Sequence, residues 1–309
     1  MTKTSPYKPS GVSVACLVPF KDDFSLDEAE LRNHVRDLLK AEGLTGFAQS
    51  SEGEVLSFDE WRRFIDIIAE EVGDTLPVIV SVYGEGLEAA HQARAAQKAG
   101  ASALMVYPPK GGPFRPETAV RHLELIAEAS SLPIMLYQFP ASTGRAYSFD
   151  TVMRLVETVT TITSFKDWSN DPALHQRFIR ALQGLPEPVN VISAHSSWLM
   201  GSLSMGCNGL CSSVGSVICG LQIALFQAIK ANDLVAARAV NERIAPITQA
   251  LYEPPTHDLH NRTKQALALV GRLRSATVRP PLGKLPEKEV DSLRKAILVS
   301  GLAPEASAA

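Results

Sequence analysis

The segment Thr160-Thr161-Ile162-Thr163-Ser164-Phe165-Lys166-Asp167-Trp168-Ser169-Asn170-Asp171 decides how this chain of 309 residues is interpreted. Its β-branched and aromatic residues predict a buried strand, which ends on Lys166 before a polar turn. Burying an ammonium group costs several kcal/mol unless it is paired or deprotonated. Lys166 therefore either reaches solvent with its amine, as strand-end lysines often do, or is held with a lowered pKa for amine chemistry.

On both sides of this strand, short β-like runs alternate with runs of helical spacing. We predict strands at 14–19, 46–50, 77–82, 103–107, 133–138, 162–166, 189–194 and 209–212, and helices at 26–41, 58–72, 87–99, 117–129, 149–157, 172–182, 197–205 and 218–231. Eight strand–helix units within one domain favour a closed (β/α)8 TIM barrel over an open doubly wound sheet. An open sheet would also carry a glycine-rich phosphate turn after its first strand, and residues 20–23 contain no glycine.

Beyond residue 231 we predict no further strand. Helical patterns cover 234–252, 263–273 and 287–299, and proline pairs separate them. We therefore expect four regions, which are a flexible N-terminal tail at 1–10, the barrel at 11–231, a C-terminal helical region at 232–302 and a disordered tail at 303–309.

The composition excludes several classes of protein. The net charge of −3 comes without a basic block, which argues against nucleic acid or an anionic membrane as a partner. The first ten residues lack the apolar segment of a secretory signal, and no apolar run is long enough to span a membrane. We therefore expect a cytoplasmic location. The four cysteines have no metal-ligand spacing, so we expect reduced core thiols, and we expect no metal; the cysteines are Cys16, Cys207, Cys211 and Cys219.

Active-site residues of a (β/α)8 barrel come from the carboxyl ends of its strands. Polar side chains stand at four such ends: 49–52 after the second strand, Tyr137 and Gln138 at the fifth, Lys166 at the sixth and His195 at the seventh. Aromatic and β-branched neighbours would lower the pKa of Lys166. A neutral amine attacks a ketone to form a Schiff base, which stabilises a carbanion at the adjacent carbon, so no cofactor is needed. The Tyr137 hydroxyl is suited to relay the proton.

Three motifs make a family resemblance specific. Leu136-Tyr137-Gln138-Phe139-Pro140 with Thr143-Gly144 is similar to the tyrosine strand of the dihydrodipicolinate synthase and N-acetylneuraminate lyase superfamily. Phe165-Lys166-Asp167 resembles its Schiff-base strand, and Ser50-Ser51-Glu52-Gly53-Glu54 resembles its Gly-Thr-Thr-Gly-Glu loop. The resemblance covers nearly the whole chain. It implies a class I aldolase on a barrel with a three-helix C-terminal extension, commonly assembled as a tetramer.

The resemblance also implies roles for single residues. Lys166 would form the imine, Tyr137 would relay protons, and Ser51, at the first threonine, would give a hydroxyl to the relay and a backbone amide to the substrate carboxylate. Glu52 falls on the second threonine, where its charge would repel a carboxylate unless the side chain turns away or serves as an acid or base. In an alternative alignment, Ser50 and Ser51 match the two threonines.

Two departures from the family bear on the substrate. Synthases for dihydrodipicolinate carry an arginine two residues after the proline of the tyrosine strand, and Ser142 stands there in this chain. They also borrow a tyrosine across the dimer from a loop in which this chain has Pro108-Pro109-Lys110. The segment after Lys166 differs from neuraminate lyases as well, so the resemblance assigns neither named activity.

Other polar and aromatic residues are assigned by their expected positions. We expect Gln138 to bind substrate and Trp168 to form a wall of the pocket, with a rim covering the barrel top as the alternative for Trp168. We expect His195 to bind a substrate hydroxyl or to act as a second acid or base, with a helix cap as the alternative. Asp167 is expected to orient a loop.

His257, Asp258 and His260 have residue types that bind metals. They belong to the C-terminal helical region, which we expect to lie away from the proposed pocket. We therefore predict a surface or interface role for them.

The sequence thus predicts a Schiff-base-forming lyase, an aldolase or a dehydratase, that acts on pyruvate, a related 2-oxo acid or a deoxy sugar acid. The alternative is a barrel that has lost catalysis and acts as a small-molecule binding or sensor protein. Glu52 and the missing arginine support this alternative, and the retained Lys166 and Tyr137 oppose it. We also expect a homo-oligomer, either a tetramer or a dimer.

Overall fold

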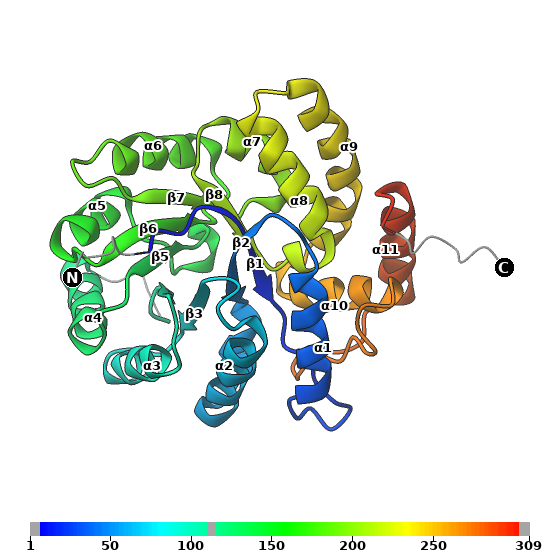
Figure 1. Ribbon diagram of the computed structural model, residues 1–309, viewed down its shortest axis with the longest axis horizontal. Helices are drawn as coiled ribbons and strands as arrows, with labels where there is room; N and C mark the ends of the chain where they lie inside the picture. Colours follow the sequence, from blue (N-terminus) through cyan, green and yellow to red (C-terminus); the bar gives the residue numbers. More distant parts are fainter. Residues whose placement is uncertain (1–6, 111–114, 303–309) are drawn as a thin grey trace.

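The centre of the computed structural model, which describes residues 7–110 and 115–302, is a closed barrel of parallel strands in chain order (Figure 1). The strands are β1 (Gly11–Cys16), β2 (Leu44–Gln49), β3 (Val78–Val82), β4 (Ala103–Val106), β5 (Ile134–Gln138), β6 (Ile162–Asp167), β7 (Asn190–Ser193) and β8 (Gly209–Ser212). Pairing of β1 with β8 closes the barrel. The predicted (β/α)8 fold class is confirmed.

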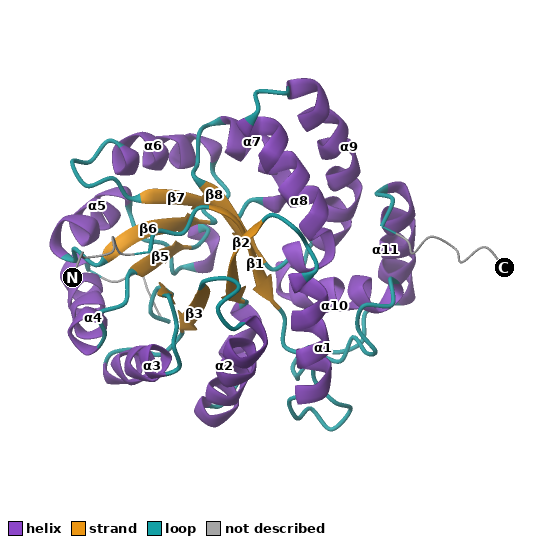
Figure 2. Ribbon diagram, in the orientation of Figure 1, coloured by secondary structure: helices purple, strands orange, loops and turns teal. Residues whose placement is uncertain are grey.

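One helix follows each strand and covers the outside of the barrel (Figure 2). These helices are α1 (Glu28–Leu39), α2 (Phe58–Val72), α3 (Leu87–Lys98), α4 (Pro116–Ala129), α5 (Phe149–Thr158), α6 (Pro172–Gln183), α7 (Leu199–Ser204) and α8 (Gly215–Lys230). Because side chains fill the inside and helices cover the outside, nearly every strand residue is buried. Helix α1 begins two residues later than predicted, since the Asp27 side chain accepts a hydrogen bond from the Glu30 N–H at 3.0 Å and caps it there.

The chain continues into three more helices, α9 (Leu234–Leu251), α10 (Leu259–Leu269) and α11 (Glu287–Val299). Helix α9 packs along α8, and α11 packs on α9 and α10 at one side of the barrel (Figure 1). Helix α10 begins four residues earlier than predicted, because its polar first turn is held by contacts that hydrophobic periodicity does not register. The buried Arg262 binds Glu289 of α11 at 2.7 Å, and Asn261 donates to the Gly283 carbonyl at 2.8 Å.

Two of the predicted regions are the tails at 1–10 and 303–309. Within the predicted N-terminal tail, Tyr7 packs against the core, and the Pro9 carbonyl accepts a hydrogen bond from Asn190 at 3.0 Å. Residues 1–6 and the predicted disordered tail at 303–309 lie outside the described residues.

The structure also bears on the expected state of the cysteines and on the expected absence of a membrane span. The four cysteines are buried and unpaired, as predicted. In the described part of the chain, no helix has both the length and the apolar character needed to cross a membrane.

Candidate active site

Lys166 and Tyr137 meet inside the barrel. Strands β5 and β6 pair in a register that places these two residues side by side. The Lys166 Nζ lies 4.2 Å from the centre of the Tyr137 ring and 3.5 Å from Sδ of Met105 on β4. Lys166 has 4% of its surface exposed and Tyr137 has 5%. We call Lys166, Tyr137, Met105 and the buried Cys211 of β8 the lysine site.

The surroundings of the lysine site favour a neutral amine. Burial lowers the pKa of Lys166 below its usual 10.5, and Cys211 acts in the opposite direction. Among the described residues no carboxylate forms an ion pair with Lys166, so no counter-charge offsets the cost of burying its ammonium group. Burial also raises the pKa of Tyr137 well above 10, which keeps its hydroxyl protonated. Of the two interpretations of Lys166, the buried lysine with a lowered pKa therefore fits the structure.

A row of aromatic rings extends from the lysine site along the mouth of the barrel. The Tyr137 ring lies 4.8 Å from Tyr107 and 4.7 Å from Phe139, centre to centre. Tyr107 contacts Tyr83 at 4.7 Å, and Phe139 contacts Trp168 at 5.6 Å. Trp168 is partly exposed at the end of this row. Its position is compatible with both the wall and the rim that the sequence predicts.

The loop after β2 carries the predicted carboxylate site. It forms a short 3-10 helix, η1 (Ser51–Val55). The Ser50 carbonyl accepts a hydrogen bond from the Tyr83 hydroxyl, and the buried Ser50 hydroxyl has no partner among the described residues. The Ser51 Oγ lies 3.1 Å from Nε2 of His260, which belongs to α10. The loop is therefore held by the barrel on one side and by the C-terminal helices on the other.

The Glu52 side chain turns toward the C-terminal helices. Its Oε1 lies 2.5 Å from Nζ of Lys264 on α10, and its Oε2 accepts a hydrogen bond from the Val18 N–H at 2.8 Å. The Lys264 amine also donates to the Thr277 carbonyl at 2.9 Å. Both charged side chains are nearly inaccessible, with 0% of Lys264 and 7% of Glu52 exposed. This ion pair neutralises the charge that would otherwise repel a carboxylate at the loop.

Gln138 does not join the lysine site. It follows Tyr137 on β5, so the two side chains point to opposite faces of the strand. Both ends of its amide are hydrogen bonded, because Nε2 donates to the Tyr147 carbonyl at 2.8 Å and Oε1 accepts from the Tyr147 N–H at 3.0 Å. Gln138 therefore fixes the segment after β5, and its position does not match the expectation that it binds substrate at the lysine site.

His195 lies in a buried cluster apart from Lys166. Its ring stacks on Trp198 at 4.3 Å and meets His175 of α6 at 5.1 Å. Its Nε2 lies 3.8 Å from Oδ2 of Asp167, which follows Lys166 on β6 and points to the opposite face of that strand. The His195 side chain has 0% exposure, and its contacts are with the protein interior. The structure thus separates His195 from the other predicted site residues.

Asp167, His175 and His195 are also the residues to consider as metal ligands, since their ligand atoms lie within 4.8 Å of one another. Asp167 Oδ2 and His175 Nδ1 are 2.7 Å apart, a hydrogen-bond distance, whereas ligands around a zinc ion at about 2.1 Å stand more than 3 Å apart. Burial alone would raise the pKa of Asp167, but the hydrogen bond with His175 and the nearby His195 ring bring it below its usual value. Asp167 also accepts a hydrogen bond from the Ser169 N–H at 2.7 Å, as its expected loop-orienting role requires.

The position of His260 differs from the one predicted from the sequence. We expected it on the surface or at an interface, away from the pocket, and it instead contacts Ser51. Burial lowers the pKa of His260, Glu52 acts to raise it, and Lys264 and Lys166 act with burial. Sequence reasoning missed this residue because no local pattern shows that α10 docks over the loop after β2.

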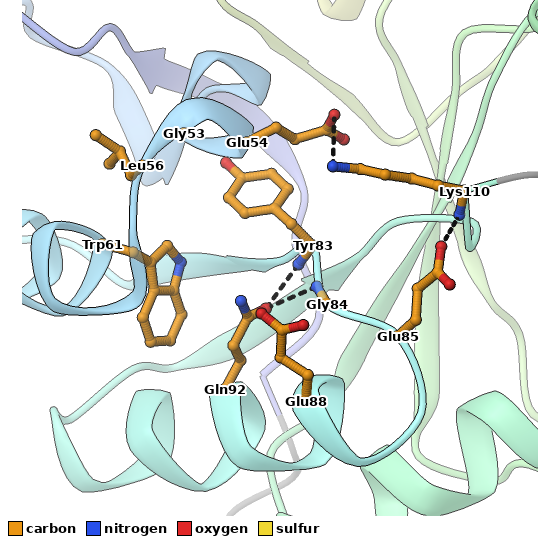
Figure 3. Close-up of a pocket in the computed structure, with 10 residues that line it drawn as sticks. All are labelled: Gly53, Glu54, Leu56, Trp61, Tyr83, Gly84, Glu85, Glu88, Gln92 and Lys110. Atoms are coloured by element: carbon orange, nitrogen blue, oxygen red, sulfur yellow. Dashed lines mark hydrogen bonds and ion pairs between the residues drawn. The ribbon is translucent and has the colours of Figure 1, made fainter.

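A cavity of about 330 Å³ lies beside the row of aromatic rings, between the loops after β2, β3 and β4 (Figure 3). Its lining includes the carboxylates Glu54, Glu85 and Glu88, together with Tyr83 and Lys110. Glu54 is paired with Lys110 at 3.9 Å and with Arg145 at 3.3 Å. Tyr83 lines this cavity and also contacts Tyr107, but Lys166 is not among the lining residues.

A (β/α)8 barrel that buries an unpaired lysine on β6 against a tyrosine on β5 defines a class of enzyme, the class I lyases that work through a lysine imine. The sequence model of the dihydrodipicolinate synthetase family matches residues 8–299, and the chain belongs to this family.

The chain is also similar in sequence to individual enzymes and solved structures of this family. The chain is 31% identical to the 4-hydroxy-tetrahydrodipicolinate synthase of Methanopyrus kandleri over 299 residues, which cover 96% of this chain and 97% of the relative. It is 31% identical to the enzyme of the same name from Acidobacterium capsulatum over 270 residues, or 85% of this chain and 87% of the relative. Among solved structures, a prophage protein of the dihydrodipicolinic acid synthase family from E. coli K12, in complex with pyruvate, is 26% identical with a TM-score of 0.88, covering 95% of this chain and 99% of that chain.

Proposed function

We propose that the protein forms an imine between Lys166 and pyruvate or a related 2-oxo acid, and then makes or breaks a carbon–carbon bond or eliminates water from a deoxy sugar acid. The observation that carries this proposal is the Lys166 amine, buried without a counter-charge 4.2 Å from the Tyr137 ring. The pyruvate complex of the similar prophage protein supports the choice of pyruvate as the first compound to test.

The proposed roles follow the geometry of the site. The Lys166 amine attacks the ketone carbon, water leaves, and the imine draws electrons from the adjacent carbon. The Tyr137 hydroxyl relays the proton of that carbon, taking it up while it passes its own hydroxyl proton on, and its ring contacts the lysine. Ser50 and Ser51 receive the substrate carboxylate, and Trp168 bounds the substrate at the end of the row of aromatic rings. Glu52 supports the loop through its ion pair with Lys264.

In this proposal the second substrate differs from that of the dihydrodipicolinate synthases. Ser142 is exposed and offers no positive charge to a second carboxylate, which argues against the substrate that dihydrodipicolinate synthases use. The choice between an aldolase and a dehydratase depends on groups that contact the distal part of the substrate. A panel of aldehydes and sugar acids, tested after imine formation has been demonstrated, distinguishes the two reactions.

The test is intact-protein mass spectrometry after incubation with pyruvate and sodium borohydride, which reduces an imine to a stable secondary amine. We expect one adduct, mapped by peptide digestion to Lys166 and absent from Lys166→Ala. Lys264 is an internal control, because it is equally buried but paired with Glu52. No adduct with pyruvate or with longer 2-oxo acids would contradict the proposal and favour the alternative of a binding barrel without catalysis.

Two further expectations accompany the proposal. We propose a homo-oligomer, a dimer or a tetramer, which sedimentation velocity would determine. The four unpaired, buried cysteines are compatible with a reducing cytoplasm, and this location stays a prediction.

A further inference from the structure

His260 joins the C-terminal helices to the proposed catalytic loop. It is the second residue of α10, and its Nε2 lies 3.1 Å from the hydroxyl oxygen of Ser51 on η1. The His260 side chain is partly exposed, whereas Ser50, Lys166 and Tyr137 are buried. His260 therefore stands between the interior of the site and solvent.

The charged groups that face His260 come from three elements. Glu52 of η1 acts to raise its pKa, whereas Lys166 of β6 and Lys264 of its own helix act with burial to lower it. Glu52 and Lys264 neutralise each other through their ion pair at 2.5 Å. The balance leaves the His260 ring neutral near pH 7, with one nitrogen able to accept a proton. A serine hydroxyl next to a neutral imidazole is an arrangement in which a proton passes from oxygen to nitrogen.

We propose that His260 is a positioning residue that acts through Ser51, orienting its hydroxyl and carrying the proton between the lysine site and solvent. This inference rests on the proposed function. When the C–H bond next to the imine breaks, its electron pair becomes the carbon–carbon double bond of the enamine. The electron pair of the imine double bond moves to the Lys166 nitrogen. The Tyr137 hydroxyl takes the proton from the carbon as it gives its own proton to Ser51. Ser51 in turn gives its hydroxyl proton to the His260 ring, and His260 releases a proton to solvent. The reverse path returns a proton to that carbon.

The test measures proton transfer separately from imine formation. Pyruvate is incubated with the full chain in D2O, and proton NMR follows the loss of its methyl signal as deuterium replaces hydrogen. At saturating pyruvate the imine is already formed, so titration of the free Lys166 amine does not affect the rate. Borohydride trapping of the same samples measures the imine itself.

Two substitutions separate this role from support of the fold. In His260→Gln, the side-chain amide can still hydrogen bond Ser51 but does not titrate. We expect its exchange rate to fall about tenfold or more, with trapping at Lys166 retained. Because burial holds the pKa of His260 below the ordinary histidine value of about 6.5, the wild-type rate should decline only at a pH below that value, and this decline should be absent from His260→Gln. His257→Gln is the matched control, because His257 is exposed three residues earlier, and it should behave as wild type.

A double mutant tests whether His260 acts through Ser51. If it does, Ser51→Ala with His260→Gln exchanges no more slowly than Ser51→Ala alone. Full trapping with wild-type exchange and an unchanged pH profile in His260→Gln overturns the role of His260 and leaves the proposed function standing. Independent, additive losses in the double mutant overturn it as well. A wild-type chain that gives no adduct overturns the proposed function, and the role of His260 with it.

Discussion

Removing the charge of Glu52 should destabilise the fold without stopping imine formation. At an effective dielectric constant of about 20, two opposite unit charges about 3 Å apart attract by roughly 5–6 kcal/mol. Much of this attraction is offset by the cost of burying both ions. Removing only one partner, however, leaves the other buried without a counter-charge, which costs about 3–5 kcal/mol. Glu52→Gln should therefore lose about that much stability, since Lys264 has 0% exposure and keeps the Thr277 carbonyl and the Phe20 ring as neighbours but no carboxylate among the described residues.

Urea unfolding followed by circular dichroism measures this loss. For 309 residues with an unfolding entropy of about 2.1 cal/mol/K per residue, the same loss lowers the melting temperature by roughly 5–8 °C. The double variant Glu52→Gln with Lys264→Met should recover part of the loss, because no buried charge remains unpaired. Glu128→Gln is the control, since its pair with Arg121 is exposed and should contribute less than about 1 kcal/mol.

Two outcomes would refute this reasoning. One is a Glu52→Gln variant within about 0.5 kcal/mol of wild type, which would mean that the ion pair is not buried as the structure has it. The other is a stable Glu52→Gln variant that no longer traps pyruvate on Lys166. In that case the Glu52 carboxylate would take part in the chemistry itself.

Two other predictions concern Tyr137 and His34. Tyr137→Phe should slow deuterium exchange of pyruvate about 100-fold or more, because it removes the hydroxyl that moves the proton; exchange within a few-fold of wild type would exclude that role. Burial lowers the pKa of His34 to about 3, and neither ring nitrogen has a partner among the described residues. As the pH falls, His34 is protonated near pH 6.5 in the unfolded chain but only near pH 3 in the folded protein. The contribution of His34 to the free energy of unfolding therefore has its full value above about pH 6.5 and decreases by about 1.4 kcal/mol per pH unit between pH 6.5 and pH 3. Urea midpoints at pH 7 and 5.5 should differ less in His34→Leu than in wild type, and equal differences would contradict the assignment.

The barrel and its lysine were predictable because their signals are local. Each strand is a short run of buried residues between turn residues, and β6 has this form up to Lys166. The alternation of side chains along a strand is an equally local signal, and it predicts that Gln138 points away from the lysine site. Because Tyr137 faces the barrel interior, Gln138 beside it must face the helices.

The contacts of Glu52 and His260 could not be predicted in the same way. Each depends on a helix that folds against the loop from far along the chain, and 209 residues separate Ser51 from His260. Periodicity places residues on a face of a helix but does not say which loop that face will meet. His195 was misplaced for a related reason. It stands at a strand end as expected, but its ring turns into the layer between the strands and the helices, toward Asp167 and Trp198.

The hydrogen bond between Ser51 and His260 can form only after both residues have been synthesised on the ribosome. The loop after β2 is made early, and its partner follows 209 residues later. At about 5–20 residues per second, that interval lasts roughly 10–40 s. A nascent chain that has already completed β5 and β6 holds Tyr137 and Lys166, but Glu52 still lacks its cation and Ser51 lacks its imidazole. Helix α10 therefore completes a site whose first residues were made about 209 residues earlier.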